Sequence, residues 1–135
     1  MRKIKLICIQ VPSRPGVLGS LTRTLFKKGV NIEAIFAPEA NDFGLIRLFP
    51  DDFAGAEAAL SALGYPLGVE EAYLVRLKDK PGSLLELVER LALSGININY
   101  MFCTTSGRGR MENAILSISG SPQGERILDE MTEKD

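Results

Sequence analysis

The sequence predicts an α+β fold made of two similar βαββαβ units, and two repeated motifs carry this prediction. The segment Pro-Gly-Val-Leu at residues 15–18 returns as Pro-Gly-Ser-Leu at 81–84. The segment Gly-Val-Asn-Ile at 29–32 returns as Gly-Ile-Asn-Ile at 95–98, with the same offset of 66 residues. A repeat at a fixed period indicates two structural units of similar length.

The first copy begins with a strand and an amphipathic helix. Residues 6–11 are short, apolar and β-branched, and they end at the turn-forming segment 12–15. A helix then runs to a C-terminal cap at Gly29. Helical spacing puts these apolar residues on one of its faces: Val17, Leu18, Leu21, Leu25 and Phe26.

Two strands and a second helix complete the pattern of the first copy. The strands are expected at 31–37 and 44–49, around a turn at 39–42. The pair Asp51-Asp52 can cap an alanine-rich helix that ends near Leu63-Gly64.

The second copy repeats this order. Strands are expected at 73–77, 97–104 and 113–119, with a helix at 82–94 after the first strand and a glycine-rich turn at 106–109. Ser121-Pro122 then caps a last helix that ends near Met131.

The two copies join through residues 65–71, which supply the fourth strand of the first unit and run into the first strand of the second. We therefore expect domains at 1–70 and 71–135. Only four residues follow the last predicted helix, so the second unit lacks a final strand. Its sheet edge is then exposed, covered by a neighbour, or completed by a partner chain.

The composition sets limits on function. The 135 residues are 45% apolar and carry a net charge of −1, which gives no electrostatic reason to expect nucleic acid or a membrane as partner. No stretch approaches the roughly 18 apolar residues of a membrane span, and no segment is typical of a signal peptide. We therefore expect a cytoplasmic protein.

The residues that usually carry metal or nucleophilic chemistry are scarce. The chain contains no histidine, which excludes a histidine-based triad and a histidine-liganded metal. Cys8 and Cys103 each lie in an apolar run without a partner at metal-ligand spacing, so we expect both to be buried, inert thiols. We expect no metal and no cofactor.

A βαββαβ order implies an antiparallel sheet with both helices on one face, which is the ferredoxin-like arrangement. This fold alone does not name a function, because it carries RNA-binding, metal-transporting, catalytic and sensing proteins. The decision therefore rests on side chains.

The repeated motifs resemble the signature of ACT domains, which are amino-acid-sensing regulatory modules. In the first copy the match is Ser-Arg-Pro-Gly-Val-Leu with Gly-Val-Asn-Ile, and in the second it is Asp-Lys-Pro-Gly-Ser-Leu with Gly-Ile-Asn-Ile. The segment 41–47, Asn-Asp-Phe-Gly-Leu-Ile-Arg, further resembles stand-alone proteins of two tandem ACT domains. The resemblance covers nearly the whole chain and implies two ferredoxin-like units side by side.

Physical chemistry agrees with a ligand at the start of each first helix. Gly16 and Gly82 open these helices, where free N–H groups and the helix dipole favour an anion such as an α-carboxylate. The missing Cβ also lets a ligand approach the backbone.

The resemblance implies where the rest of the ligand lies. The asparagines that would bind its ammonium group map to Asn31 and Asn97, and each loop would meet the second strand of the other unit, so that the ligand lies between the copies. Its side chain would contact apolar residues, which favours a small or apolar amino acid. The candidate ligand-binding residues are Ser13, Gly16, Val17, Leu18, Asn31, Ile32, Asp79, Gly82, Ser83, Leu84, Asn97 and Ile98.

The chain departs from the family pattern near these loops. Some ACT domains have a histidine near the end of the first strand and an asparagine before Arg-Pro-Gly. The chain has Val11 and Ser13 there in the first copy, and Leu77 and Asp79 in the second. Asp79 can attract an ammonium directly and Ser13 is a weaker partner, so the two sites need not be equivalent.

Other charged residues have a simpler interpretation. Glu39, Asp42 and Arg47 lie at a turn and on an alternating strand, where we expect solvated charges. Arg108 and Arg110 lie in the glycine-rich turn, where we expect a solvated hairpin tip, and a contact with a partner protein is the alternative.

Competing functions lack their residues. The sequence has neither the aromatic and basic surface of RNA-binding domains, nor the anion loop of acyl phosphatases, nor the paired cysteines of metal chaperones. We therefore predict a non-enzymatic, amino-acid-binding regulatory protein, a homodimer that acts on an enzyme or regulator of amino-acid metabolism. The remaining alternative is an ACT pair without ligand that acts as a protein–protein assembly module.

Overall fold

The computed structural model describes residues 1–40, 42–105, 107, 109–120 and 122–134. It divides into two compact units, which we call the first unit, Lys5–Glu70, and the second unit, Glu71–Asp135 with Met1–Ile4. The predicted residues Asn41, Ser106, Arg108 and Ser121 lie outside the described part of the chain.

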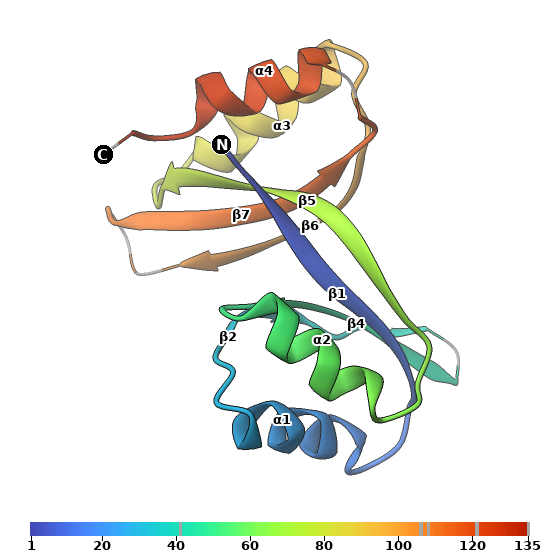
Figure 1. Cartoon of the computed structure of the whole chain (residues 1–135). Coiled ribbons are helices and arrows are strands. Elements are labelled where there is room, and N and C mark those ends of the chain that lie inside the picture. The colour runs from blue at the N-terminus through green and yellow to red at the C-terminus, as the bar shows by residue number, and fades with distance from the viewer. Residues whose placement is uncertain (41, 106, 108, 121, 135) are drawn as a thin grey trace. The chain divides into compact units, whose positions relative to one another are not determined.

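The first unit is a sheet with two helices on one face (Figure 1). The strand order is β2-β4-β1-β5, and β4 pairs antiparallel with β1 and with β2. In chain order its elements are β1 (Arg2–Pro12), α1 (Val17–Lys27), β2 (Ile32–Phe36), β3 (Glu39–Ala40), β4 (Phe43–Pro50), α2 (Phe53–Ser61) and the beginning of β5 (Leu67–Lys78).

The second unit repeats this arrangement. Its strand β7 pairs antiparallel with β5 and with β6, and both helices cover one face of the sheet (Figure 1). The remaining elements are α3 (Ser83–Leu93), β6 (Ile98–Thr105), β7 (Met111–Ile118) and α4 (Pro122–Met131). Within the described residues, no helix is long and apolar enough to cross a membrane.

Each unit has its own apolar core, and the repeat places the same helix positions in both. Leu21 and Leu25 of α1 are fully buried, as are Leu87 and Leu91 of α3 at the matching positions. The helical spacing predicted this face, and the prediction is confirmed for Leu21, Leu25 and Val17. Leu18 and Phe26, which the sequence also placed on the apolar face, are 45% and 80% exposed instead. At about 100° per residue, Phe26 lies roughly 140° around the helix from the middle of the buried face.

The turn expected at 39–42 is partly a strand. Glu39 and Ala40 form β3, which pairs with β4 through Glu39 opposite Gly44 and Ala40 opposite Phe43. The two strands meet within a tight hairpin, so residues with turn propensity still take part in strand pairing. This pairing fixes the place of Glu39.

The second unit obtains its fourth strand from the beginning of the chain. The segment after α4 forms no strand within the described residues, as predicted, and Met1–Ile4 belong to this unit. β1 is the neighbour of β5, and the side chain of Met1 packs against the second core. The sheet edge that could have required a partner chain is therefore covered by this chain itself.

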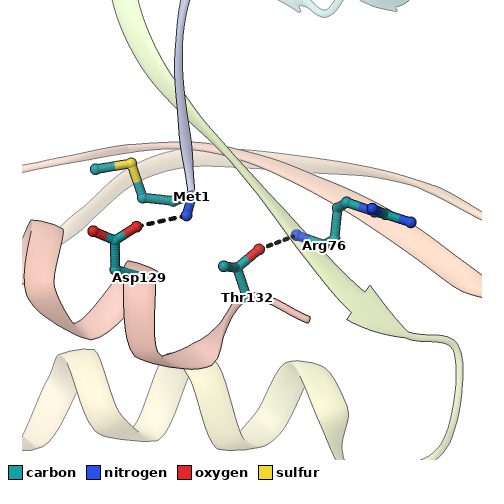
Figure 2. Close-up of polar contacts among 4 residues, drawn as sticks. All are labelled: Met1, Arg76, Asp129 and Thr132. Carbon is teal, nitrogen blue, oxygen red and sulfur yellow. Dashed lines mark hydrogen bonds and ion pairs between the residues drawn. The ribbon is translucent and has the colours of Figure 1, made fainter. Parts of the chain in front are cut away.

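Polar contacts bind the first residue of the chain and the segment after α4 to the second unit (Figure 2). The amino group of Met1 lies 2.7 Å from Oδ1 of Asp129 in α4, and Lys3 pairs with Glu125 at 3.1 Å. After α4, the hydroxyl of Thr132 accepts from the backbone N–H of Arg76 in β5 at 3.0 Å. The pKa values of the Asp129 and Glu125 carboxyl groups lie below their usual range, chiefly because of the hydrogen bonds that they accept from Met1 and Tyr73.

The two cysteines differ, which corrects one expectation. Cys8 is buried in β1, and burial raises the pKa of its thiol to about 12, so it is inert as predicted. Cys103 in β6 is exposed, and the prediction of burial is wrong for it. An apolar run does not show which face of a strand is covered.

Shortening Leu21 to alanine should lower the free energy of unfolding by about 2–5 kcal/mol, because a fully buried leucine leaves a cavity. Phe26→Ala is the matched control on the same helix, and its cost should stay below about 0.5 kcal/mol. Urea unfolding of both variants measures the difference. A Phe26 variant as unstable as the Leu21 variant would contradict the orientation of α1.

Candidate functional site

A glycine with a left-handed backbone precedes the first helix of each unit. Gly16 has a φ of 89° and occupies the N-cap of α1, and Gly82 has a φ of 94° at the N-cap of α3. Only glycine adopts this left-handed conformation readily. Among the described residues, neither helix receives a side-chain cap. In α3 the N–H of Ser83 donates to the carbonyl of Lys80 at 3.3 Å, so this N–H is not free for a ligand.

A valine at Gly16 or Gly82 would act through the backbone. A Cβ at either position would meet no atom within 4 Å, but the positive φ is strained for any side chain. Such a variant therefore disturbs the loop itself and does not isolate a steric block of the ligand.

A pocket opens beside the loop between β1 and α1 within the first unit. Its cavity volume is about 170 Å³, and its walls come from the end of β1, the β1–α1 loop, the β2–β3 junction and β4. The lining residues are Val11, Pro12, Ser13, Arg14, Val17, Leu18, Ala37, Pro38, Glu39, Gly44 and Ile46. An apolar cavity of about 150 Å³ is large enough for benzene, so this pocket accommodates a small organic molecule.

A hydrogen bond joins two walls of the pocket. The hydroxyl of Ser13 donates to Oε2 of Glu39 at 2.6 Å. The backbone N–H of Ser13 donates to the carbonyl of Asp42 at 3.2 Å, which ties the loop to the β3–β4 hairpin. Arg14 adds a positive charge to the same lining. The pocket therefore presents both signs of charge beside an apolar wall.

The loop of the second unit is fastened differently. The backbone N–H of Asp79 donates to the carbonyl of Arg110 at 2.6 Å, and the N–H of Gly109 donates to the carbonyl of Asp79 at 2.7 Å. Asp79 corresponds to Ser13 in the repeat, and its carboxylate charge raises the pKa of Glu112 in addition to the larger effect of burial. The two loops are thus not equivalent, in agreement with their sequences.

The asparagines lie far from the loop of their own unit. Asn31 lies beside Asp51, just after the end of β4, because its backbone N–H donates to the Asp51 carboxylate at 2.9 Å. Pro12, where the β1–α1 loop begins, pairs with Phe43 at the opposite end of β4. Eight residues of strand separate these two ends, about 26 Å. In the second unit, the carbonyl of Asn97 accepts from the N–H of Ser119, just after the end of β7. Lys78, which precedes the loop of this unit, pairs with Met111 at the start of β7. Their contact with the loop of the other copy stays a prediction.

The other predicted residues divide into two groups. Ser13, Val17 and Leu18 line the pocket. Ile32, Leu84 and Ile98 are partly buried against the cores of their own units, and Ser83 is buried.

Several lining residues were missed by sequence reasoning. Arg14, Ala37, Glu39 and Gly44 come to the loop because β2, β3 and β4 fold back onto the end of β1. The hairpin signal around residues 39–44 was visible in the sequence, but its position beside the β1–α1 loop depends on strand pairing.

Arg47 also departs from expectation, because it is not a solvated charge. Its side chain is 15% exposed, and its Nε donates to Oε2 of Glu70 at 3.2 Å. It lies opposite Cys8 on β1 and contributes to the sheet rather than to the pocket.

A larger surface depression on α4 is a weaker candidate. It is lined by residues of one helix and its end, and two of them, Glu125 and Asp129, already pair with Lys3 and the amino group of Met1. Because these charges are already paired, the pocket of the first unit is the better site.

Comparison with solved structures identifies the fold. A protein from Bacteroides thetaiotaomicron superposes with a TM-score of 0.86 at 23% identity, over 95% of this chain and 88% of the other. The ligand-free regulatory subunit of aspartate kinase from Thermus thermophilus gives a TM-score of 0.67 at 17% identity, over 96% and 89% of the two chains.

A third neighbour is part of a larger enzyme. Escherichia coli aspartokinase III, solved in complex with lysine and aspartate, gives a TM-score of 0.58 at 14% identity, over 97% of this chain and 31% of that one. No model of a protein family and no curated protein matches the chain. At these identities the likeness establishes the fold.

Replacing Glu112 with glutamine should stabilise the protein at pH 7. Burial and the charge of Asp79 raise the pKa of this carboxyl group above 4.5, so ionising it costs more in the folded than in the unfolded state. The cost is absent below pH 4.5 and grows as the pH rises through the raised value.

Urea unfolding at pH 7 and at pH 3.5 measures this effect, with the exposed Glu89→Gln as control. We expect a gain for the Glu112 variant at pH 7 that disappears at pH 3.5. An equal gain at both pH values would show that charge is not its cause.

Proposed function

We propose that this chain, which has the fold of tandem ACT-domain proteins, is a regulatory protein that binds an amino acid and has no catalytic activity of its own. The observation that carries the proposal is the pocket beside the β1–α1 loop, where Arg14, Glu39 and an apolar wall surround a cavity of about 170 Å³. A zwitterion with a small side chain matches these three features.

The parts of the ligand have distinct partners in this proposal. The carboxylate lies near Arg14 and the first N–H groups of α1, where the positive end of the helix dipole adds to the attraction. The side chain lies against Val17, Leu18 and their apolar neighbours. The backbone at Gly16 allows close approach because no Cβ is present.

A second site at the loop of the other copy is part of the proposal. Its residues are Asp79, Gly82, Ser83 and Leu84, with the amide of Asn31 contributed by the first copy, as Asn97 would contribute to the first site. The backbone of Asp79 is bonded to the β6–β7 hairpin, so the affinities of the two sites should differ.

A regulatory role requires a target protein that responds to the liganded chain. We propose that the liganded chain acts, as a homodimer in the cytoplasm, on an enzyme or regulator of amino-acid metabolism. Support comes from the fold, which it shares with the regulatory subunit of an aspartate kinase.

A second candidate is an assembly module without ligand. Phe26 of α1 and Leu93 of α3 are 80% and 88% exposed, and large apolar side chains at such positions suit a protein contact. The two candidates differ in one observable, the binding of a free amino acid.

A thermal-shift screen against the twenty amino acids tests the proposal. A ligand that binds only the folded protein stabilises it by about 2.7 kcal/mol at roughly 100 times its Kd, which raises the unfolding midpoint by several degrees. The absence of a shift with every amino acid at millimolar concentration would favour the assembly module.

Filling the pocket should weaken binding without harming the fold. Ala37 lines the pocket and is exposed, so Ala37→Leu adds a larger side chain to the wall and should cost about tenfold in affinity or more. Ala54→Leu makes the same change at an exposed position of α2 outside the pocket and should leave affinity unchanged. Calorimetric titration compares the two. Equal affinities would place the ligand elsewhere.

The asparagines provide a test of the site between copies. If Asn97 binds the ligand, Asn97→Ala removes a hydrogen bond to a charged group, worth about 1.5–3 kcal/mol or roughly a tenfold to hundredfold loss of affinity. Asn31→Ala makes the same test for the second site. Both asparagines are exposed, so stability should change little. Unchanged affinity in both variants would confine the ligand to one unit.

A further inference from the structure

We infer that Glu39, held in place by Ser13, accepts the ammonium group of an amino acid with a small aliphatic side chain in the pocket of the first unit. This inference rests on the amino-acid binding proposed above and names the residue that recognises the ligand. Glu39 is not part of the repeated motif.

Strand pairing brings Glu39 to the pocket. Glu39 begins β3 and lies opposite Gly44 of β4, and both residues line the cavity. Gly44 has no side chain, and a Cβ there would lie 3.5 Å from Cγ2 of Val11 on β1. This is an ordinary van der Waals distance, and the pairing of Gly44 with Val11 places the hairpin beside the end of β1.

The hydrogen bond from Ser13 orients the carboxylate. The Ser13 hydroxyl, from the β1–α1 loop, donates to Oε2 at 2.6 Å and thus connects Glu39 to the loop across the pocket. A carboxylate has two oxygens with about four acceptor positions, so one donor leaves Oε1 with acceptor capacity. An ammonium group has three donors and can use it.

Two backbone carbonyls near Glu39 each already accept one hydrogen bond. The carbonyl of Pro38 accepts from the N–H of Leu45 at 3.2 Å, and the carbonyl of Asp42 accepts from the N–H of Ser13 at 3.2 Å. Among the described residues that line the pocket, Glu39 is the only carboxylate and Arg14 the only cation. A cationic ligand group therefore finds its strongest partner in Glu39.

The remaining wall defines the ligand class. Apart from Ser13, Arg14 and Glu39, the lining side chains are aliphatic or proline: Val11, Pro12, Val17, Leu18, Ala37, Pro38 and Ile46. A polar side chain of the ligand would lose water here without gaining a partner. An acidic side chain would also be repelled by Glu39. Both effects favour alanine, valine or leucine over polar amino acids.

Calorimetric titration with L-valine and two analogues isolates the contact. Isobutylamine keeps the amine and lacks the carboxylate, and 3-methylbutanoate keeps the carboxylate and lacks the amine. Glu39→Gln should lower the affinity for L-valine and for isobutylamine about tenfold or more, because a charge-assisted hydrogen bond is lost. The affinity for 3-methylbutanoate should not fall, since it has no ammonium group.

Two further variants complete the design. Glu33→Gln changes an exposed glutamate of β2 that does not line the pocket, and it should leave the affinity for L-valine unchanged. Ser13→Ala removes the hydrogen bond that orients Glu39 but keeps the charge of Glu39. The affinity of this variant for L-valine should therefore fall less, about threefold. Unfolding midpoints of all variants verify that the fold is retained.

Different titration results would contradict the role of Glu39 and the proposed amino-acid binding. If none of the twenty amino acids binds, the proposed function fails. If L-valine binds and Glu39→Gln keeps its affinity within about twofold, or weakens 3-methylbutanoate equally, the role of Glu39 is overturned and the function stands. If only polar amino acids bind, the aliphatic ligand class is overturned. A loss in Asn97→Ala without a loss in Glu39→Gln assigns the ammonium to Asn97.

Discussion

The left-handed backbone of one glycine in each copy is the constraint on which the rest of the structure depends. At Gly16 and Gly82 the chain turns from a strand into a helix with φ near 90°, which other residues adopt only with strain. Where the helix begins decides which leucines face the sheet, so Leu21 and Leu87 are buried at matching positions. The same turn leaves the N–H groups at the start of the helix without a side-chain cap among the described residues.

The two copies keep this turn and differ in what contacts it. In the first unit, Ser13 reaches the carboxylate of Glu39 on a short strand, and a cavity remains between loop and hairpin. In the second unit, the backbone of Asp79 is bonded directly to the hairpin on both its N–H and its carbonyl. A repeated fold can thus keep the same buried positions in both cores while its two loops differ in chemistry.

The covering of the second sheet shows how an incomplete repeat is made stable. The second copy supplies no final strand of its own within the described residues, and Met1–Ile4 take that place beside β5. Met1 adds its side chain to the core and its amino group to Asp129. An edge that would expose unpaired backbone groups is thereby covered. The sequence showed the missing strand but not its replacement, because nothing in the first four residues marks them as belonging to the second copy.

The sequence by itself determined the repeat, the order of helices and strands except for the short strand β3, and the buried positions Leu21, Leu25, Leu87 and Leu91, because these follow from the spacing of glycines and leucines along one segment. It also located the β1–α1 loop, with Ser13, Val17 and Leu18. Tertiary structure alone decided that Glu39 and Arg14 share a pocket, that Arg47 pairs with Glu70, and that Cys103 is exposed. Those outcomes depend on which strands become neighbours, and contacts between residues far apart in the chain leave no periodic signal in the sequence.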